Sequence, residues 1–223
     1  IAADGSLVVT YNYTRNKYAL TWEANGGNIS GNYTKGDVKF GASITAPLNA
    51  NVTKTGSNFL GWNPSVIPAT MPAETLTFVA QWEAKTFTGI TFTSEDENEG
   101  TVSVNPQKNE YTYGDNVTIT ATAAEGYEFS GWSDGNNDVE RTITVTESTT
   151  SLTATFSPKT NISYTVRFWK QNLNDDEYTE QLPAEYRTGT TGALTNAAAV
   201  AKVYDGFEQL SFDEKIIAGD GST

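Results

Sequence analysis

The stretch Phe59-Leu60-Gly61-Trp62 returns as Phe129-Ser130-Gly131-Trp132, seventy positions later in a chain of 223 residues. Two further pairs follow nearly the same period. Gln81-Trp82 and Thr155-Phe156 end two apolar segments 74 positions apart, and residues 1–6 return almost unchanged as residues 217–222. That last offset is 216, or three times 72. A period well below the size of a typical domain predicts a tandem array of small modules.

The period divides the chain into about three modules. We interpret residues 1–16 as the final strand of a preceding repeat, residues 17–84 as the first module and residues 85–158 as the second. Residues 159–223 form a third module, which we expect to lack its final strand. The segments between modules are only a few residues long, so we expect an elongated array with restricted bending.

Each module is expected to be mainly β, with little helix. Apolar side chains alternate with other residues along nearly every strong segment, as in Leu76, Phe78, Ala80 and Trp82. Strict alternation is typical of a strand with one buried face, and turns rich in Gly and Asn separate these segments. One Ala-rich stretch, residues 195–202, departs from this pattern and predicts one or two helical turns.

The composition excludes several kinds of chemistry. The formal charge is −13, from 14 basic and 27 acidic residues, and such a surface repels nucleic acid and anionic membranes. The chain has no cysteine and no histidine, which excludes disulfides, thiol catalysis and histidine general bases. No apolar run approaches the length of a membrane span, so we expect no membrane insertion in this segment.

Several stretches carry a resemblance to known repeats. The first module holds residues 18–27, Phe59-Leu60-Gly61-Trp62, Met71-Pro72-Ala73 and residues 76–82, which together resemble the Listeria–Bacteroides repeat, the internalin B-repeat family. The second module resembles the divergent branch of that family in residues 100–104, Tyr113-Gly114-Asp115, residues 126–135 and residues 152–156. The third holds residues 164–168, Gly192 and Gly206-Phe207, and is similar to mucin-binding-protein-type or B-repeat-like repeats, but without the Gly-Trp signature.

The resemblance implies small β-grasp-like modules strung together on bacterial surface and secreted proteins. It therefore implies an extracellular location at the bacterial cell surface. Members of the family are not known as enzymes, so the resemblance supplies no catalytic residue, no cofactor and no metal ligand. The roles that it suggests are attachment to host or neighbouring cells and spacing of other domains.

Tryptophan has two possible roles in this chain. Trp62 and Trp132 recur at one position of the module, after an aromatic residue and a glycine, and this recurrence favours core anchors over sugar-stacking platforms. Trp169 differs, because Tyr164, Val166 and Phe168 share the inward face of its strand. Trp169 should therefore point outward, where it contacts a ligand, packs on the adjacent module or packs on the hairpin near Tyr178.

A calcium loop is one interpretation of Asp134, Asn136 and Asp138, which have the alternating spacing of such loops. The complete pattern requires glycine at the sixth position and glutamate at the twelfth, where this chain has Val139 and Val145. The sequence therefore favours a hairpin turn without a metal ion.

Three functional hypotheses follow. We expect a non-catalytic spacer and adhesion segment whose partner is a surface protein or glycan of the host or of bacteria. The alternative is a carbohydrate- or glycoprotein-binding module, which an exposed aromatic pair near Trp169 would favour. An enzyme ranks lowest, because no catalytic motif is present. We also expect head-to-tail self-association, in which residues 7–15 of one chain complete the third module of the next.

Overall fold

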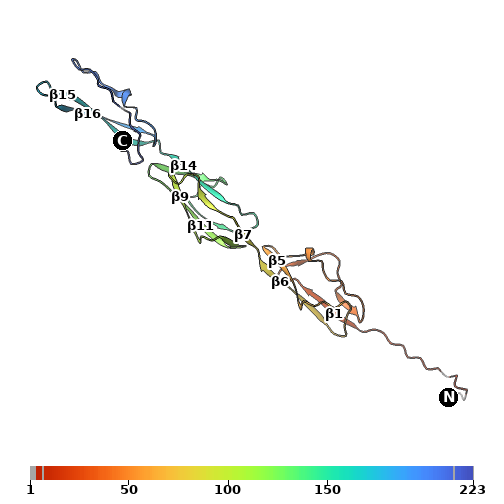
Figure 1. The fold of residues 1–223 in the computed structure, drawn as a ribbon. Helices are drawn as coiled ribbons and strands as arrows, with labels where there is room; N and C mark the ends of the chain where they lie inside the picture. The colour runs from red at the N-terminus through yellow and green to blue at the C-terminus, as the bar shows by residue number, and fades with distance from the viewer. Residues whose placement is uncertain (1–3, 7, 213, 223) are drawn as a thin grey trace. The chain divides into compact units, whose positions relative to one another are not determined.

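The computed structural model describes residues 4–6, 8–212 and 214–222 (Figure 1). The chain is mainly β, as predicted, and the described residues contain no α-helix. They fall into two compact units, one formed by residues up to Phe87 together with Thr112–Gly114 and the other by the remaining residues. The helical turns expected within residues 195–202 are present as a short 3-10 helix, η2 (Ala197–Val200).

The first unit contains a mixed four-stranded sheet. Its strands are β1 (Lys17–Glu23), β3 (Gly36–Lys39), β5 (Ser57–Asn63) and β6 (Leu76–Ala84), in the order β3-β1-β6-β5. The central strands β1 and β6 are parallel, and the outer pairs are antiparallel. The smaller elements are β2 (Asn28–Ile29), η1 (Asn49–Asn51) and β4 (Val52–Thr53), of which β2 pairs with β4. Strand β7 (Thr86–Thr88) begins in this unit, and its last residue belongs to the second.

Alternation along these strands builds an aromatic core. Phe78 and Ala80 of β6 are fully buried, and Trp22 of β1 packs on Phe78 with ring centroids 4.6 Å apart. Trp62 of β5 meets Trp22 edge to face at 4.8 Å. Leu20 is also buried in this cluster. Large rings bury much apolar surface per residue, which suits a unit with a small core.

The second unit contains two three-stranded sheets. Its first strands are β8 (Phe92–Ser94), β9 (Gly100–Asn105), β10 (Glu110–Thr112), β11 (Asn116–Ala123), β12 (Tyr127–Trp132), β13 (Glu140–Thr144) and β14 (Leu152–Pro158). One sheet has the order β13-β11-β9 and the other the order β12-β14-β8. In the latter, β8 and β14 are parallel and β12 is antiparallel to β14. This order and these directions repeat those of β1, β6 and β5 in the first unit.

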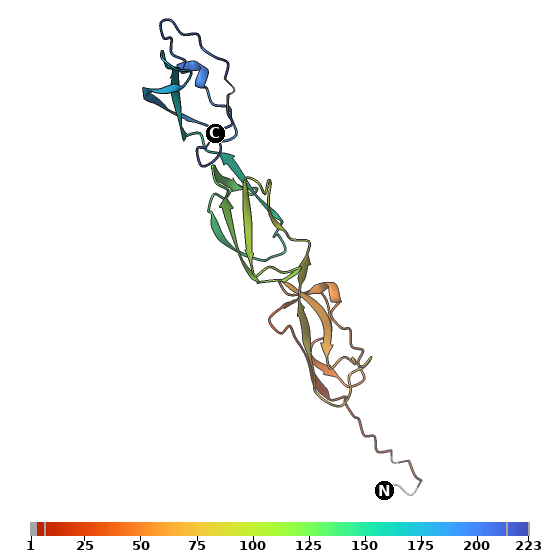
Figure 2. The same cartoon turned by 60° about the vertical axis from the view of Figure 1, so that its left-hand side comes forward.

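The remainder of the second unit contains the long hairpin of β15 (Ile162–Gln171) and β16 (Tyr178–Gly189) (Figure 2). The chain continues through η2, and residues 201–212 form no strand. Ile217 then returns to a buried position, and its neighbour Ile216 bridges Leu194.

This part of the second unit contacts the loop before β12. The Thr191 hydroxyl donates a hydrogen bond of 2.8 Å to the Gly126 carbonyl, and the Lys159 backbone N–H donates to the same oxygen at 2.8 Å. The backbone of Gly219 lies directly against Glu125, because a Cβ on Gly219 would come within 2.2 Å of the Glu125 carbonyl oxygen. Contacts of this kind hold the hairpin region against the β12 loop.

Residues 8–16 precede β1 and belong to no strand. Their apolar side chains are in solvent: Val8 is 80% exposed, Tyr11 77% and Tyr13 90%. Leu7, the first residue of the strand expected here, lies outside the described residues. At the end of the segment, the Arg15 guanidinium donates a hydrogen bond to the Phe40 carbonyl at 3.1 Å.

Candidate binding site

The repeated tryptophans are core residues, as the sequence predicted. Trp62 is 7% exposed and Trp132 3% exposed. Trp132 donates from Nε1 to the Asp138 carbonyl at 2.8 Å, whereas Nε1 of Trp62 is buried and has no hydrogen-bond partner among the described residues. Both rings are therefore buried in the cores of their own modules, and neither presents a face to a ligand.

The glycine before each tryptophan is explained by backbone conformation. Gly61 and Gly131 lie at β-bulges and have φ values of +119° and +146°, which side-chain-bearing residues rarely adopt. Close packing beneath the ring does not explain Gly61, because a Cβ there would have no atom within 4 Å.

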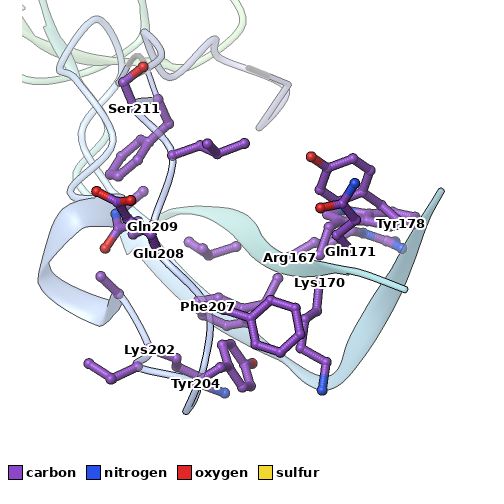
Figure 3. A pocket seen from close by; sticks show the side chains of 18 of the residues that line it. Arg167, Lys170, Gln171, Tyr178, Lys202, Tyr204, Phe207, Glu208, Gln209 and Ser211 are labelled. Carbon is purple, nitrogen blue, oxygen red and sulfur yellow. The ribbon is translucent and has the colours of Figure 1, made fainter. Parts of the chain in front are cut away.

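A groove of about 890 Å³ lies beside the β15–β16 hairpin and is lined by three exposed aromatic residues of the second unit, Trp169, Tyr178 and Phe212 (Figure 3). One wall is β15, and the opposite wall is formed by residues 201–212. Consecutive residues of β15, including Phe168, Trp169 and Lys170, all line this groove. Because neighbouring residues of a strand point to opposite faces, the groove follows the edge of β15 and is not confined to one face.

Trp169 lies on the outer face, as predicted, and is 57% exposed. It pairs with Glu180 across the hairpin, and Gln171 pairs with Tyr178, which is 48% exposed. These four residues share one face, and a diagonal neighbour on such a face is within reach of an aromatic side chain. Figure 3 shows Tyr178 beside Gln171. Trp169 and Tyr178 are therefore two exposed aromatic residues on one face of the hairpin.

The inner side of the groove combines aromatic rings with basic groups. Nζ of Lys170 lies 5.1 Å from the ring centroid of Phe207 and 5.7 Å from that of Tyr204. Nζ of Lys202 lies 4.3 Å from the ring centroid of Phe168. The sequence prediction missed Tyr204 and Lys170 as groove residues. The signal for Tyr204 was the aromatic spacing around the turn at Gly206, since residues 201–212 have no strand periodicity.

Ion pairs on the hairpin engage two of the basic residues. Arg167 contacts Glu180 at 3.2 Å, and Lys202 contacts Glu185 at 3.3 Å. The turn between the two strands has the opposite character, since Asp175-Asp176-Glu177 follow one another there. The groove is thus bordered by basic groups along β15 and by acidic groups at the end of the hairpin.

Glu214 anchors the wall of the groove that begins with η2. Its carboxylate accepts hydrogen bonds from the Thr195 hydroxyl at 2.6 Å and from the backbone N–H groups of Ala197 and Ala198 at 3.1 and 3.0 Å. The hydroxyl of Thr195, followed by the two N–H groups, holds the pKa of Glu214 below its ordinary value. The ionised carboxylate therefore fixes the beginning of the 3-10 helix.

The Asp134 segment is a turn, but the prediction of a hairpin is wrong. It joins β12 to β13, which lie in different sheets.

Partial burial opposes ionisation of Asp134, but the Asn136 N–H and the Arg141 guanidinium outweigh it and hold the pKa of Asp134 below its ordinary value. Arg141 donates to both carboxylate oxygens at 2.9 and 2.8 Å. Within the described part of the chain, no group of acidic side chains is arranged to hold a metal ion.

Two family models match the chain. Residues 18–81 match the Listeria-Bacteroides repeat domain, and residues 90–171 match the divergent InlB B-repeat domain. The resemblance predicted for the first two modules is therefore confirmed, and the chain carries repeat domains of these two types. No curated protein and no solved structure matches the chain.

Repeats of this type occur in bacterial surface proteins, and their families are generally non-catalytic. The matched ranges end at Gln171, so the similarity of the third module to mucin-binding repeats stays a prediction. The β-grasp assignment also stays a prediction. Among the residues that the structure describes, no helix has the length and apolar character needed to cross a membrane.

Proposed function

We propose that this chain is a non-catalytic repeat segment of a bacterial surface or secreted protein. In this proposal it acts as a spacer and adhesion module toward host or neighbouring cells. The observation that carries the proposal is the recurrence of one core element, the bulged strand that carries Trp62 or Trp132, in two successive modules. In both, the aromatic residues stabilise the module itself.

A spacer has to keep its length under load, so its modules should unfold as separate units. In each of the two matched modules, one sheet pairs its first strand along the chain in parallel with its last. These pairs are β1 with β6 and β8 with β14. Pulling on the ends of such a module loads these two strands in shear along their shared hydrogen bonds. We expect separate force peaks when the chain is stretched by single-molecule force spectroscopy, and smooth extension without peaks would contradict the spacer role.

A second candidate function, glycan or glycoprotein binding, is supported by the pair Trp169 and Tyr178. Aromatic side chains that expose one face and stand beside polar groups offer both apolar contact and orientation to a sugar ring. Gln171 and Glu180 supply such polar groups on the same face. The location that we propose, outside the cell at the bacterial surface, would give this face access to host glycans.

An array of glycans, mucins and matrix proteins, probed at physiological salt, tests this second function. Saturable binding that Trp169→Ala abolishes would support it. The matched control is Tyr186→Ala, since Tyr186 is 82% exposed on the same hairpin but does not line the groove. Absence of binding by the folded chain would leave the spacer function alone.

A further inference from the structure

The chain leaves each of the two matched modules through a lysine that follows the last strand of a sheet. Lys85 follows β6, and Lys159 follows β14. The Lys85 N–H donates a hydrogen bond of 2.9 Å to the Gly56 carbonyl, and the Lys159 N–H donates one of 2.8 Å to the Gly126 carbonyl. The two glycines are equivalent, since each lies three residues before the aromatic residue at the bulge. The same bond therefore closes both modules.

The carbonyl groups of these two lysines accept hydrogen bonds from the module that follows. The Tyr113 N–H donates to the Lys85 carbonyl at 2.9 Å, and the Thr191 N–H donates to the Lys159 carbonyl at 3.0 Å. In both places the next residue is a glycine with positive φ. Each lysine thus joins two modules through its backbone, its N–H bonding to the one and its C=O to the other.

The first module forms the same carbonyl bond just before β1. The Phe40 N–H donates to the Asn16 carbonyl at 2.8 Å, and Gly41 follows Phe40 with a φ of +71°. The acceptor residue is asparagine here and lysine in the other two places. The bond therefore recurs in three successive modules and depends on the backbone, not on the side chain of the acceptor residue.

The residue that donates to the lysine also covers the glycine turn. The ring of Tyr113 lies so close to Gly56 that a Cβ on Gly56 would overlap with it, and the side chain of Thr191 restricts Gly126 in the same way. The Thr191 hydroxyl also donates to the Gly126 carbonyl at 2.8 Å. Both glycines have positive φ, +67° and +83°. Glycine is therefore required in this turn by its conformation and by the close approach of the next module.

Tyr113 belongs to one repeat by sequence and to the other by contacts. It lies within residues 90–171, which match the divergent domain, but Thr112–Gly114 belong to the first compact unit. Tyr111, two residues earlier, is buried in the second unit, where its hydroxyl donates to the Pro106 carbonyl at 3.2 Å. A short turn of the second repeat therefore completes the first unit.

We propose that the glycine turn, at Gly56 and again at Gly126, is a docking surface on which each repeat receives the next repeat of the chain. The partner that it fits is a repeat that returns a backbone N–H from a residue followed by a left-handed glycine. Because backbone groups make these bonds, the surface accepts repeats of different sequence, which is how two repeat types are combined in this chain. The docked turn protects the end of the preceding module against local opening.

Native-state hydrogen exchange tests which unit the docked turn protects. We expect Tyr113→Ala to reduce the protection of the Lys85 amide, in the first unit, by roughly tenfold, because the ring no longer covers the glycine turn. Tyr111→Phe is the matched contrast, and its loss of protection should be confined to the second unit. A loss confined to the second unit in Tyr113→Ala, or no loss at all, would overturn the proposal.

A second variant tests whether the two glycine turns are equivalent. Tyr113→Thr should retain more protection of the Lys85 amide than Tyr113→Ala, since a threonine hydroxyl there can donate to the Gly56 carbonyl as Thr191 does to Gly126. Equal loss in the two variants would contradict a shared docking surface. The spacer role is tested separately by force, so the two proposals can fail independently.

Discussion

Phe129 lies opposite Phe156 across β12 and β14, with ring centroids 5.8 Å apart, just as Phe59 lies opposite Trp82 across β5 and β6 at 5.4 Å. In both pairs the first aromatic residue precedes a bulge glycine, and the tryptophan after that glycine pairs with an alanine. The 70- and 74-residue offsets in the sequence therefore correspond to the same cross-strand pair in two successive modules. The repeat is conserved in side-chain packing as well as in sequence.

The bulge glycines should resist substitution to different extents. We expect Gly61→Ala to reduce the free energy of unfolding by about 1–3 kcal/mol, because alanine must adopt a strained φ there. Gly131→Ala should cost more, since its Cβ would also lie 2.6 Å from Oδ1 of Asn137. Urea unfolding monitored by NMR signals of each unit measures both values. Leu60→Ala, at a 62% exposed neighbouring position, is the control and should be nearly neutral.

Replacing the two core tryptophans by phenylalanine should separate packing from hydrogen bonding. Both substitutions remove part of a buried ring, but only Trp132→Phe removes a hydrogen bond and leaves the Asp138 carbonyl without its donor. Trp62→Phe instead removes a buried N–H that has no partner among the described residues. We expect Trp132→Phe to be more destabilising by roughly 1 kcal/mol. Equal losses in urea unfolding would show that the hydrogen bond contributes little.

The sequence was most informative where side chains alternate strictly. Alternation in residues 76–82 correctly predicted a strand with Phe78 and Ala80 inward, and the recurring Gly-Trp pair correctly predicted buried rings. The groove was not predictable, because residues 201–212 follow no period and are placed by contacts with β15. The turn at Asp134 was assigned to a hairpin because spacing alone does not say which sheet the next strand joins.

Acid should loosen η2 through Glu214. The folded-state pKa of Glu214 is below its ordinary value of 4.5, so its ionised carboxylate stabilises the fold at neutral pH. This contribution is lost as the pH falls through that lowered pKa. We expect the protection of the Ala197 and Ala198 amides against hydrogen exchange, relative to their intrinsic rates at each pH, to fall as the pH drops through that lowered pKa, and Glu214→Gln should reduce the same protection at pH 7. Exchange that is unaffected by Glu214→Gln would contradict this assignment.

Gly219 should be essential for the contact between the hairpin region and the loop before β12. Its backbone does not require glycine, but a Cβ would lie 2.2 Å from the Glu125 carbonyl oxygen. We expect Gly219→Ala to separate these segments, break the bond from Thr191 to Gly126, and reduce stability by about 1–3 kcal/mol. Thr191→Val removes only the hydrogen bond, so its cost should be nearer 1 kcal/mol. Proteolysis of the native chain near residue 219 would report the separation.

The central claim is that Trp62 and Trp132 each stabilise a separate load-bearing module. Single-molecule stretching of the natural chain and of its Trp62→Ala and Trp132→Ala variants tests this claim most directly. Truncating a buried tryptophan costs about 3–5 kcal/mol, so each variant should weaken or lose one unfolding peak and retain the others unchanged. Loss of all peaks in either variant, or no change in both, would contradict the account.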